Sequence, residues 1–170
     1  MQKPRSPLFQ RLALALFTAS LVGCDHVTKH VAERSLAGTR PLSVVPGWLD
    51  LRYTQNFDTA FSLTRPFAVE HKPIVLAIVA LAMLALVAVL WWQHRAARWP
   101  VHAGFGLIVG GALGNALDRI FRGYVVDFVH LAHWPVFNVA DVAVVAGALL
   151  LMLDQLRNRR GMHPPNTTSS

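Results

Sequence analysis

One uninterrupted apolar run constrains the fold of this chain more than any other feature. From Ile74 to Trp92, none of 19 consecutive residues has a charged side chain or a hydroxyl or amide group. As an α-helix with a rise of 1.5 Å per residue, the run would be about 28 Å long, close to the hydrocarbon thickness of a bilayer. Such an uninterrupted apolar segment is not expected in a water-soluble domain, so we predict a transmembrane helix.

Three further apolar blocks of 17 residues predict three more transmembrane helices, at residues 8–24, 101–117 and 137–153. Of the 170 residues, 54% are hydrophobic and 15% charged, and there is one cysteine. This composition excludes a soluble enzyme, a disulfide-rich scaffold and a disordered protein. We therefore predict an all-α polytopic membrane protein with a single membrane domain over residues 1–160 and a disordered tail at 161–170.

The longest predicted connection, residues 25–73, contains a pattern typical of β-structure. Leu49, Leu51 and Tyr53 alternate with the residues of a second face, and a Pro46–Gly47 turn signal stands in front of them. Apolar residues between positions 60 and 67 suit a segment that lies against the membrane surface. We expect a small external β-structure resting on the helix bundle.

The distribution of basic residues predicts the orientation in the membrane. Eight Lys and Arg residues fall on each side, but those on the side of the N-terminus are concentrated in three short segments next to helix ends. Such a concentration is typical of the cytoplasmic side, so we predict that both termini are cytoplasmic. The net charge of +7 then reflects contact with anionic lipid rather than with nucleic acid.

Two acids, Asp118 and Asp141, lie at the edges of predicted spans, where charged groups usually have a function. Asp118 continues a row of three glycines spaced four residues apart, which lets another helix approach closely and turns this face toward the bundle. Asn115 and Asn138 precede the two acids by three residues and can donate amide hydrogen bonds to them. Two neighbouring carboxylates can share a proton and activate water for peptide hydrolysis.

The residues alone leave other roles open. The two acids could be structural, paired with Arg119 or Arg122, or could belong to a small transporter or proton-relay protein. Asp127, His130 and His133 could hold a metal ion, although the common zinc motif H-E-x-x-H is missing.

The N-terminal segment also allows a second interpretation. Basic residues, an apolar run and then Leu21-Val22-Gly23-Cys24 are similar to a lipoprotein signal peptide ending at a cysteine that becomes lipid-modified. Three further predicted spans argue against this interpretation, because lipoproteins are typically soluble domains on a lipid tether.

Three sequence blocks together resemble the signature of lipoprotein signal peptidase (signal peptidase II). They are GGALGNALDR at 110–119, VVDF at 125–128 and FNVAD at 137–141. The resemblance implies a multi-pass aspartic peptidase, a hydrolase of the bacterial inner membrane, that cuts diacylglyceryl-modified prolipoproteins just before the lipidated cysteine. It also implies a four-helix bundle with a periplasmic β-cradle and a short surface helix.

The resemblance assigns roles to individual residues. Asp118 and Asp141 match the catalytic aspartates, near the periplasmic face. Further supporting or substrate-binding positions are Asp25, Lys29, Asn56, Asn115, Arg119 and Asn138. The chain departs from the family pattern at His26, where the family has glutamine, and at Asp58, where it has glycine. The resemblance implies no cofactor and no metal; the expected partners are prolipoprotein substrates and membrane lipid, and we expect a monomer.

Overall fold

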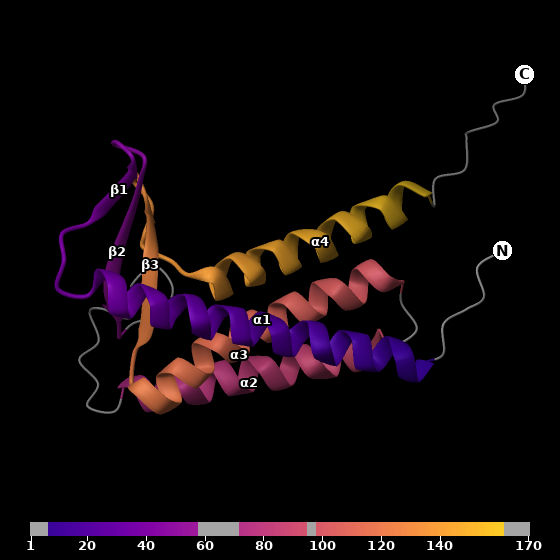
Figure 1. Cartoon of the computed structure of the whole chain (residues 1–170). Helices are drawn as coiled ribbons and strands as arrows, with labels where there is room; N and C mark the ends of the chain where they lie inside the picture. Colours follow the sequence, from indigo (N-terminus) through magenta and orange to yellow (C-terminus); the bar gives the residue numbers. More distant parts are fainter. Residues whose placement is uncertain (1–6, 58–71, 95–97, 162–170) are drawn as a thin grey trace, which may run out of the picture.

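The structure, a computed structural model, describes residues 7–57, 72–94 and 98–161. It contains four long helices and one small sheet (Figure 1). The helices are α1 (Pro7–Leu36), α2 (Lys72–Gln93), α3 (Trp99–Arg122) and α4 (Val139–Gly161), and the strands are β1 (Leu42–Val45), β2 (Leu49–Asn56) and β3 (Val125–Leu131).

Three of the helices are long and apolar enough to cross a membrane. These candidate spans are Ile74–Gln93, Trp99–Arg122 and Val139–Asn158, in the part of the chain that the structure describes. The prediction of a mostly helical membrane protein with a small sheet is thus confirmed; the fourth predicted span, residues 8–24 within α1, is not among these candidates.

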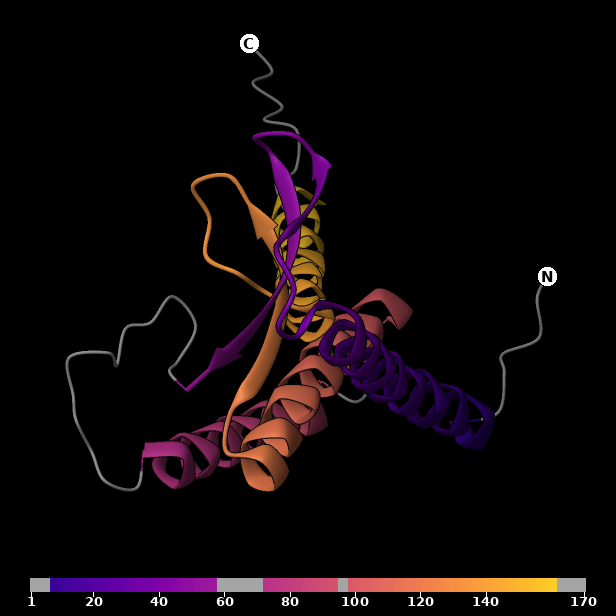
Figure 2. The same cartoon turned by 60° about the vertical axis from the view of Figure 1, so that its left-hand side comes forward.

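Helix α3 is the centre of the bundle and packs against each of the other three helices, an arrangement that Figure 2 shows from a second direction. Its glycines make the packing against α4 close. A methyl group on Gly111 would collide with the backbone carbonyl oxygen of Ala140, and one on Gly147 would lie 2.6 Å from the carbonyl oxygen of Gly104. Gly104, Gly111 and Gly147 therefore let α3 and α4 approach closely, whereas the predicted row of Gly106, Gly110 and Gly114 faces α1, next to Leu14, Leu21 and Asp25.

The sheet has the order β1-β2-β3, with both pairs antiparallel. The predicted strand and turn are confirmed: Gly47 has φ +77°, and the N–H of Trp48 donates to the carbonyl oxygen of Val45 at 2.9 Å. Strand β3 lies beside β2, with Asn56 opposite Val125. The sheet lies at the end of the bundle where α1 and α3 end and α4 begins (Figure 1).

Three predicted boundaries need correction. Helix α1 continues past Cys24 to Leu36, so Asp25 and Lys29 are helical residues and not part of a loop. Helix α3 continues to Arg122 and α4 begins at Val139. Hydropathy placed the ends of α1 and α3 too early because it treats every charged residue as a stop, whereas paired charges can be buried inside a helix. Helix α4 begins two residues later than predicted because Asn138 caps its first turn. The expected surface helix, with Ala60 and Phe61, and the substitution at Asp58 lie outside the described residues.

Candidate active site

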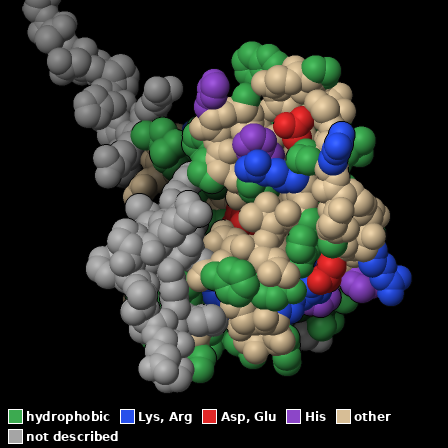
Figure 3. Space-filling model, turned by 90° about the vertical axis from the view of Figure 1, so that its left-hand side faces the viewer, with side chains coloured by type: hydrophobic (Ala, Val, Ile, Leu, Met, Phe, Trp, Pro, Cys, Tyr) green, Lys and Arg blue, Asp and Glu red, His purple; other side chains and the backbone are tan. Residues whose placement is uncertain are grey.

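A network of polar side chains fills the junction between the helices and the sheet. Helix α1, helix α3, the sheet and the start of α4 supply two members each. The members are Asp25, Lys29, Asn56, Asn115, Asp118, Asp127, Asn138 and Asp141. Seen from the sheet end, the surface shows only scattered acidic and basic side chains among hydrophobic ones (Figure 3), because much of the network is buried.

Lys29 is the cation at the centre of the network. Its side chain is fully buried, and its Nζ lies 2.7 Å from Oδ2 of Asp25 and 2.9 Å from Oδ2 of Asp118. Asp25 stands one helical turn before Lys29 on the same face of α1, which explains their contact. A buried ammonium needs this degree of compensation, since an isolated charge at this depth would be very costly.

The two carboxylates around Lys29 also join the helices. The second oxygen of Asp25 accepts from the backbone N–H of Ala140 at 2.9 Å, so α1 caps the free N–H of the first turn of α4. Asp118 also forms an ion pair with Nε of Arg122 at 3.2 Å, and Arg122 donates to Glu33 at 2.7 Å. Both acids thus hold helices together through their contacts with cations and backbone.

Asn115 connects this ion cluster to Asp141. Its Oδ1 accepts from Nζ of Lys29 at 2.9 Å, and its Nδ2 donates to Oδ1 of Asp141 at 2.8 Å. The predicted pairing of Asn115 with Asp118 along α3 does not appear among the described contacts; the amide instead reaches across to α4. Asp141 is half-buried, whereas Asp118 is fully buried.

Asn138 holds the start of α4 in a reciprocal cap. Its Oδ1 accepts from the N–H of Asp141 and its own N–H donates to Oδ2 of Asp141, both at 3.1 Å. This is the geometry of a capping box, with the acid three residues after the cap. Asn138 therefore donates a hydrogen bond to the carboxylate of Asp141, as predicted, but the donor is its backbone N–H and not its side-chain amide.

The amide of Asn138 also binds Asp127, at the middle of β3. Nδ2 of Asn138 donates to Oδ1 of Asp127 at 2.6 Å, and Nδ2 of Asn56 donates to Oδ2 of the same carboxylate at 2.8 Å. Asn56 ends strand β2, next to β3 in the sheet, so strand pairing brings these two residues together. Asp127 and Asp141 therefore share one supporting residue, Asn138.

Asp127 has a strongly altered acidity. Burial raises the pKa of Asp127 to about 6, and the nearby negative charge of Asp141 adds to the rise. Hydrogen bonds from Asn56 and Asn138 act in the opposite direction, since they favour the ionised form. Arg119 interacts electrostatically with both Asp127 and Asp141. A raised pKa beside a second carboxylate is typical of an acid–base pair.

The two acids expected to form a pair have different partners in the structure. Asp118 has Lys29 and Arg122 as its partners, while Asp141 contacts Asn115 and Asn138. Asp127 was predicted only as a possible metal ligand. The signal that could have identified it is the VVDF block itself, in which an acid follows two valines in a strand segment that is buried on both faces.

The residues considered as metal ligands do not converge. Asp127 and His130 are three positions apart on β3, and successive side chains of a strand point to opposite faces. His130 instead lies near Asp50, with Nδ1 3.8 Å from Oδ2. Within the described residues, no group of three or more His, Cys, Asp or Glu side chains could hold a metal ion.

Fold and site together define a polytopic membrane protein with a network of carboxylates and amides at one end of its helix bundle. Residues 17–157 match the family described as signal peptidase (SPase) II. A lipoprotein signal peptidase from Solibacter usitatus is 35% identical over 150 residues, covering 84% of this chain and 89% of the relative. One from Chlorobaculum tepidum is 38% identical over 161 residues, covering 86% and 92%.

The fold is also found in solved structures. A bacterial membrane enzyme determined by the in meso method at 2.3 Å resolution aligns with a TM-score of 0.75 and 21% identity, covering 92% of this chain and 94% of that one. The chain belongs to the signal peptidase II family, and it is a bacterial membrane peptidase.

Proposed function

We propose that this peptidase removes signal peptides from diacylglyceryl-modified prolipoproteins by cutting the bond just before the lipidated cysteine. The names of the relatives support this substrate class. The position of the site supports it too, since the carboxylates lie at the end of apolar helices, where a lipid-anchored peptide would present its scissile bond. Burial of acyl chains contributes about 0.8 kcal/mol per CH₂, which explains a requirement for lipid modification.

The catalytic pair that the geometry favours is Asp127 with Asp141. The observation that carries this assignment is that Asn138 binds both carboxylates while Asp118 is bound to two cations. Oδ2 of Asp118 faces Lys29 and its Oδ1 faces Arg122, so both of its oxygens are already engaged in ion pairs. Asp127, in contrast, has a pKa of about 6 and can hold a proton near neutral pH. We therefore replace the expected pair of Asp118 and Asp141.

The chemistry then follows a two-carboxylate scheme. Ionised Asp141, which is half-buried and reachable by water, accepts a proton as the water oxygen bonds to the scissile carbonyl carbon. Protonated Asp127 gives its proton to the carbonyl oxygen. When the tetrahedral gem-diol intermediate collapses, Asp127 takes a proton back from one of its hydroxyl groups, the carbon–nitrogen bond breaks and the proton on Asp141 passes to the leaving amine. Arg119 interacts electrostatically with both acids, and Asn56, Asn115 and Asn138 position their carboxylates through hydrogen bonds.

The proposed membrane arrangement has four spans. Helix α1, at 30 residues, would be about 45 Å long, enough to cross the bilayer and extend beyond it. Exposed apolar side chains mark its lipid-facing side: Phe9, Leu12, Leu16, Phe17, Val27 and Val31. Helix α1 begins and α4 ends at the same end of the bundle, opposite the sheet (Figure 1).

This arrangement supports an inner-membrane protein with both termini cytoplasmic and the sheet and site at the periplasmic face. The concentration of basic residues near the end opposite the sheet agrees with that orientation. All members of the network come from one chain, so a monomer suffices for activity.

A cleavage assay with purified protein and a diacylglyceryl-modified lipobox peptide tests the assignment. Asp127→Asn and Asp141→Asn should each lower kcat by at least about a hundredfold, the usual scale for a lost acid or base, in a protein that remains folded. Asp50→Asn is the matched control on the sheet and should stay active. Asp118→Asn should lose thermal stability and keep measurable cleavage.

Two outcomes would overturn this assignment. Near-normal cleavage by Asp127→Asn would remove Asp127 from the chemistry. Complete loss of cleavage in a stably folded Asp118→Asn protein would restore the pair expected from the sequence.

A further inference from the structure

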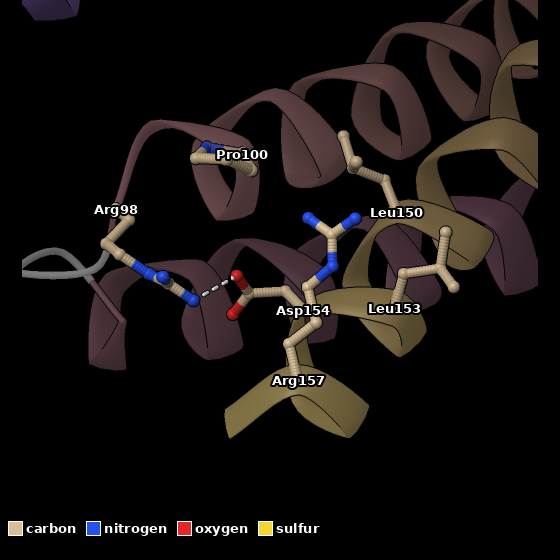
Figure 4. Close-up of a pocket in the computed structure, with 6 residues that line it drawn as sticks. All are labelled: Arg98, Pro100, Leu150, Leu153, Asp154 and Arg157. Atoms are coloured by element: carbon tan, nitrogen blue, oxygen red, sulfur yellow. Dashed lines mark hydrogen bonds and ion pairs between the residues drawn. The ribbon is translucent and has the colours of Figure 1, made fainter. Parts of the chain in front are cut away.

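A second polar site lies at the opposite end of the bundle from the carboxylates. It is a pocket of about 130 Å³ between the first turn of α3 and the last turns of α4 (Figure 4). A water molecule occupies about 30 Å³ in the liquid, so the pocket has room for about four waters or a group of similar size. Its lining is Arg98, Pro100, Leu150, Leu153, Asp154 and Arg157.

The three charged residues of the pocket have unequal environments. Nη2 of Arg98 lies 2.6 Å from Oδ1 of Asp154 and 2.8 Å from Oδ1 of Asn158, so this guanidinium is fixed by α4. The side chain of Asp154 is only 13% exposed, which strengthens its electrostatic attraction to Arg98. Arg157 makes no ion pair or hydrogen bond with the residues that the structure describes.

The pocket therefore has one positive charge in excess. Arg98 and Asp154 cancel, and the guanidinium of Arg157 lies next to them on the α4 side (Figure 4). A guanidinium without a carboxylate partner suits a phosphate, since its planar set of N–H donors matches phosphate oxygens. The complementary ligand is therefore anionic.

The rest of the lining is apolar and continues along the membrane-spanning surface. Leu153 is 48% exposed, and the span Trp99–Arg122 begins at this pocket while the span Val139–Asn158 ends at it. A ligand that fills it would have its charged group at the bilayer boundary and its apolar part against the leucines. Free phosphate has no such apolar part, so the lining favours a lipid.

From this we infer that the pocket between α3 and α4 binds the headgroup phosphate of an anionic phospholipid, with Arg157 as its main ligand. Arg98 forms the opposite wall, and Asp154 limits affinity by neutralising it. The site is separate from the carboxylate network and does not depend on the proposed substrate or catalytic pair.

Native mass spectrometry of the detergent-purified full chain can test this inference. The probes are phosphatidylglycerol and phosphatidylcholine with the same acyl chains, and inorganic phosphate alone. Phosphatidylglycerol should bind more tightly than phosphatidylcholine. Arg157→Gln should weaken it about fivefold, the equivalent of ~1 kcal/mol for one basic residue at an anionic membrane surface. Arg34→Gln, which removes an exposed charge at the other end of the bundle, should have no effect.

Asp154→Asn provides a test of opposite sign. It frees Arg98 from its carboxylate and should tighten phosphatidylglycerol binding, whereas a merely structural ion pair predicts no gain. Where Arg157→Gln fails to fold, Arg157→Lys serves in its place: it keeps the charge but loses the planar set of donors, so it should bind phosphatidylglycerol more weakly than the unaltered protein but still in preference to phosphatidylcholine.

Three results would overturn the inference: equal binding of the two lipids, equal effects of Arg157→Gln and Arg34→Gln, or displacement of the lipid by millimolar inorganic phosphate. The last result would show that free phosphate, rather than a lipid, is the ligand.

Discussion

Replacing Lys29 by methionine tests the central feature of the site most directly. Methionine is unbranched and of similar length, so it fills the space but removes the only buried lysine ammonium of the network. Two carboxylates and one amide oxygen lose a partner at once, since Nζ lies 2.7 Å from Asp25, 2.9 Å from Asp118 and 2.9 Å from Asn115.

The expected cost follows from what each acid keeps. Removing one partner of a buried ion pair costs about 3–5 kcal/mol. Asp118 still has Arg122 at 3.2 Å, whereas Asp25 keeps only the N–H of Ala140 at 2.9 Å, so Asp25 accounts for most of the loss. We expect the free energy of unfolding of Lys29→Met to fall by about 4 kcal/mol. For a chain of this length, that is a decrease in Tm of about 12 °C.

Thermal unfolding in detergent, followed by tryptophan fluorescence, measures the change. Arg34→Met, an exposed position on the same helix, is the control and should change Tm by no more than about 2 °C. Adding Asp25→Asn to Lys29→Met should recover about half of the loss, because the amide needs no cation and can still accept from Ala140. Lowering the pH should also reduce the deficit, as protonated carboxyls need no counter-charge. A Tm of Lys29→Met within 3 °C of the unaltered protein would refute this account of the cluster.

Three further predictions concern the chemistry and its supports. Gly111→Ala should lower cleavage at least about tenfold, since its methyl group would push away the backbone just before Asp141. Gly23→Ala is the control, because nothing lies within 4 Å of the added methyl group. Equal effects of the two substitutions on cleavage would contradict the packing argument. If protonated Asp127 is the acid, kcat/KM should fall as the pH rises through about 6. Asn56→Leu removes a hydrogen bond that favours ionised Asp127, so it should move this fall in kcat/KM to higher pH. An unchanged pH dependence in Asn56→Leu would exclude Asp127 as the source of the fall. Cleavage should persist in excess chelator, because amide donors already occupy carboxylate oxygens of Asp127 and Asp141. A loss of activity in chelator that added zinc restores would indicate a metal-dependent reaction instead.

The helices and one strand could be predicted from the sequence because they depend on local pattern. The apolar run from Ile74 to Trp92 needs no partner to be recognised, and the alternation around Leu51 predicts a strand by itself. The sequence also indicated that Asn138 acts on Asp141, since a cap and the third residue of its helix are close in every such helix.

The partner of Asp141 could not be found in the same way. Spacing along one helix shows which residues share a face, but it does not show what a different element brings to that face. Lys29 reaches Asp118 and Asn115 from α1, 86 residues before Asn115 in the chain. Asp127 reaches Asn138 from a strand whose neighbour in the sheet is β2. Both contacts are properties of the tertiary structure.

The buried cation also explains how one network can serve both stability and chemistry. An ammonium group has only donors, so the atom of Asn115 that faces Lys29 must be the amide oxygen. The NH₂ group of Asn115 is then forced toward Asp141, where it donates at 2.8 Å. With the amide reversed, an oxygen would face the Asp141 carboxylate and the contact would become repulsive. Lys29 thus sets the donor that orients Asp141 without touching it, while Asp118 compensates the charge of Lys29. A fixed ion pair on one side and an exchangeable proton on the other require different acids, and for this reason we propose Asp118 for the first role and Asp127 for the second.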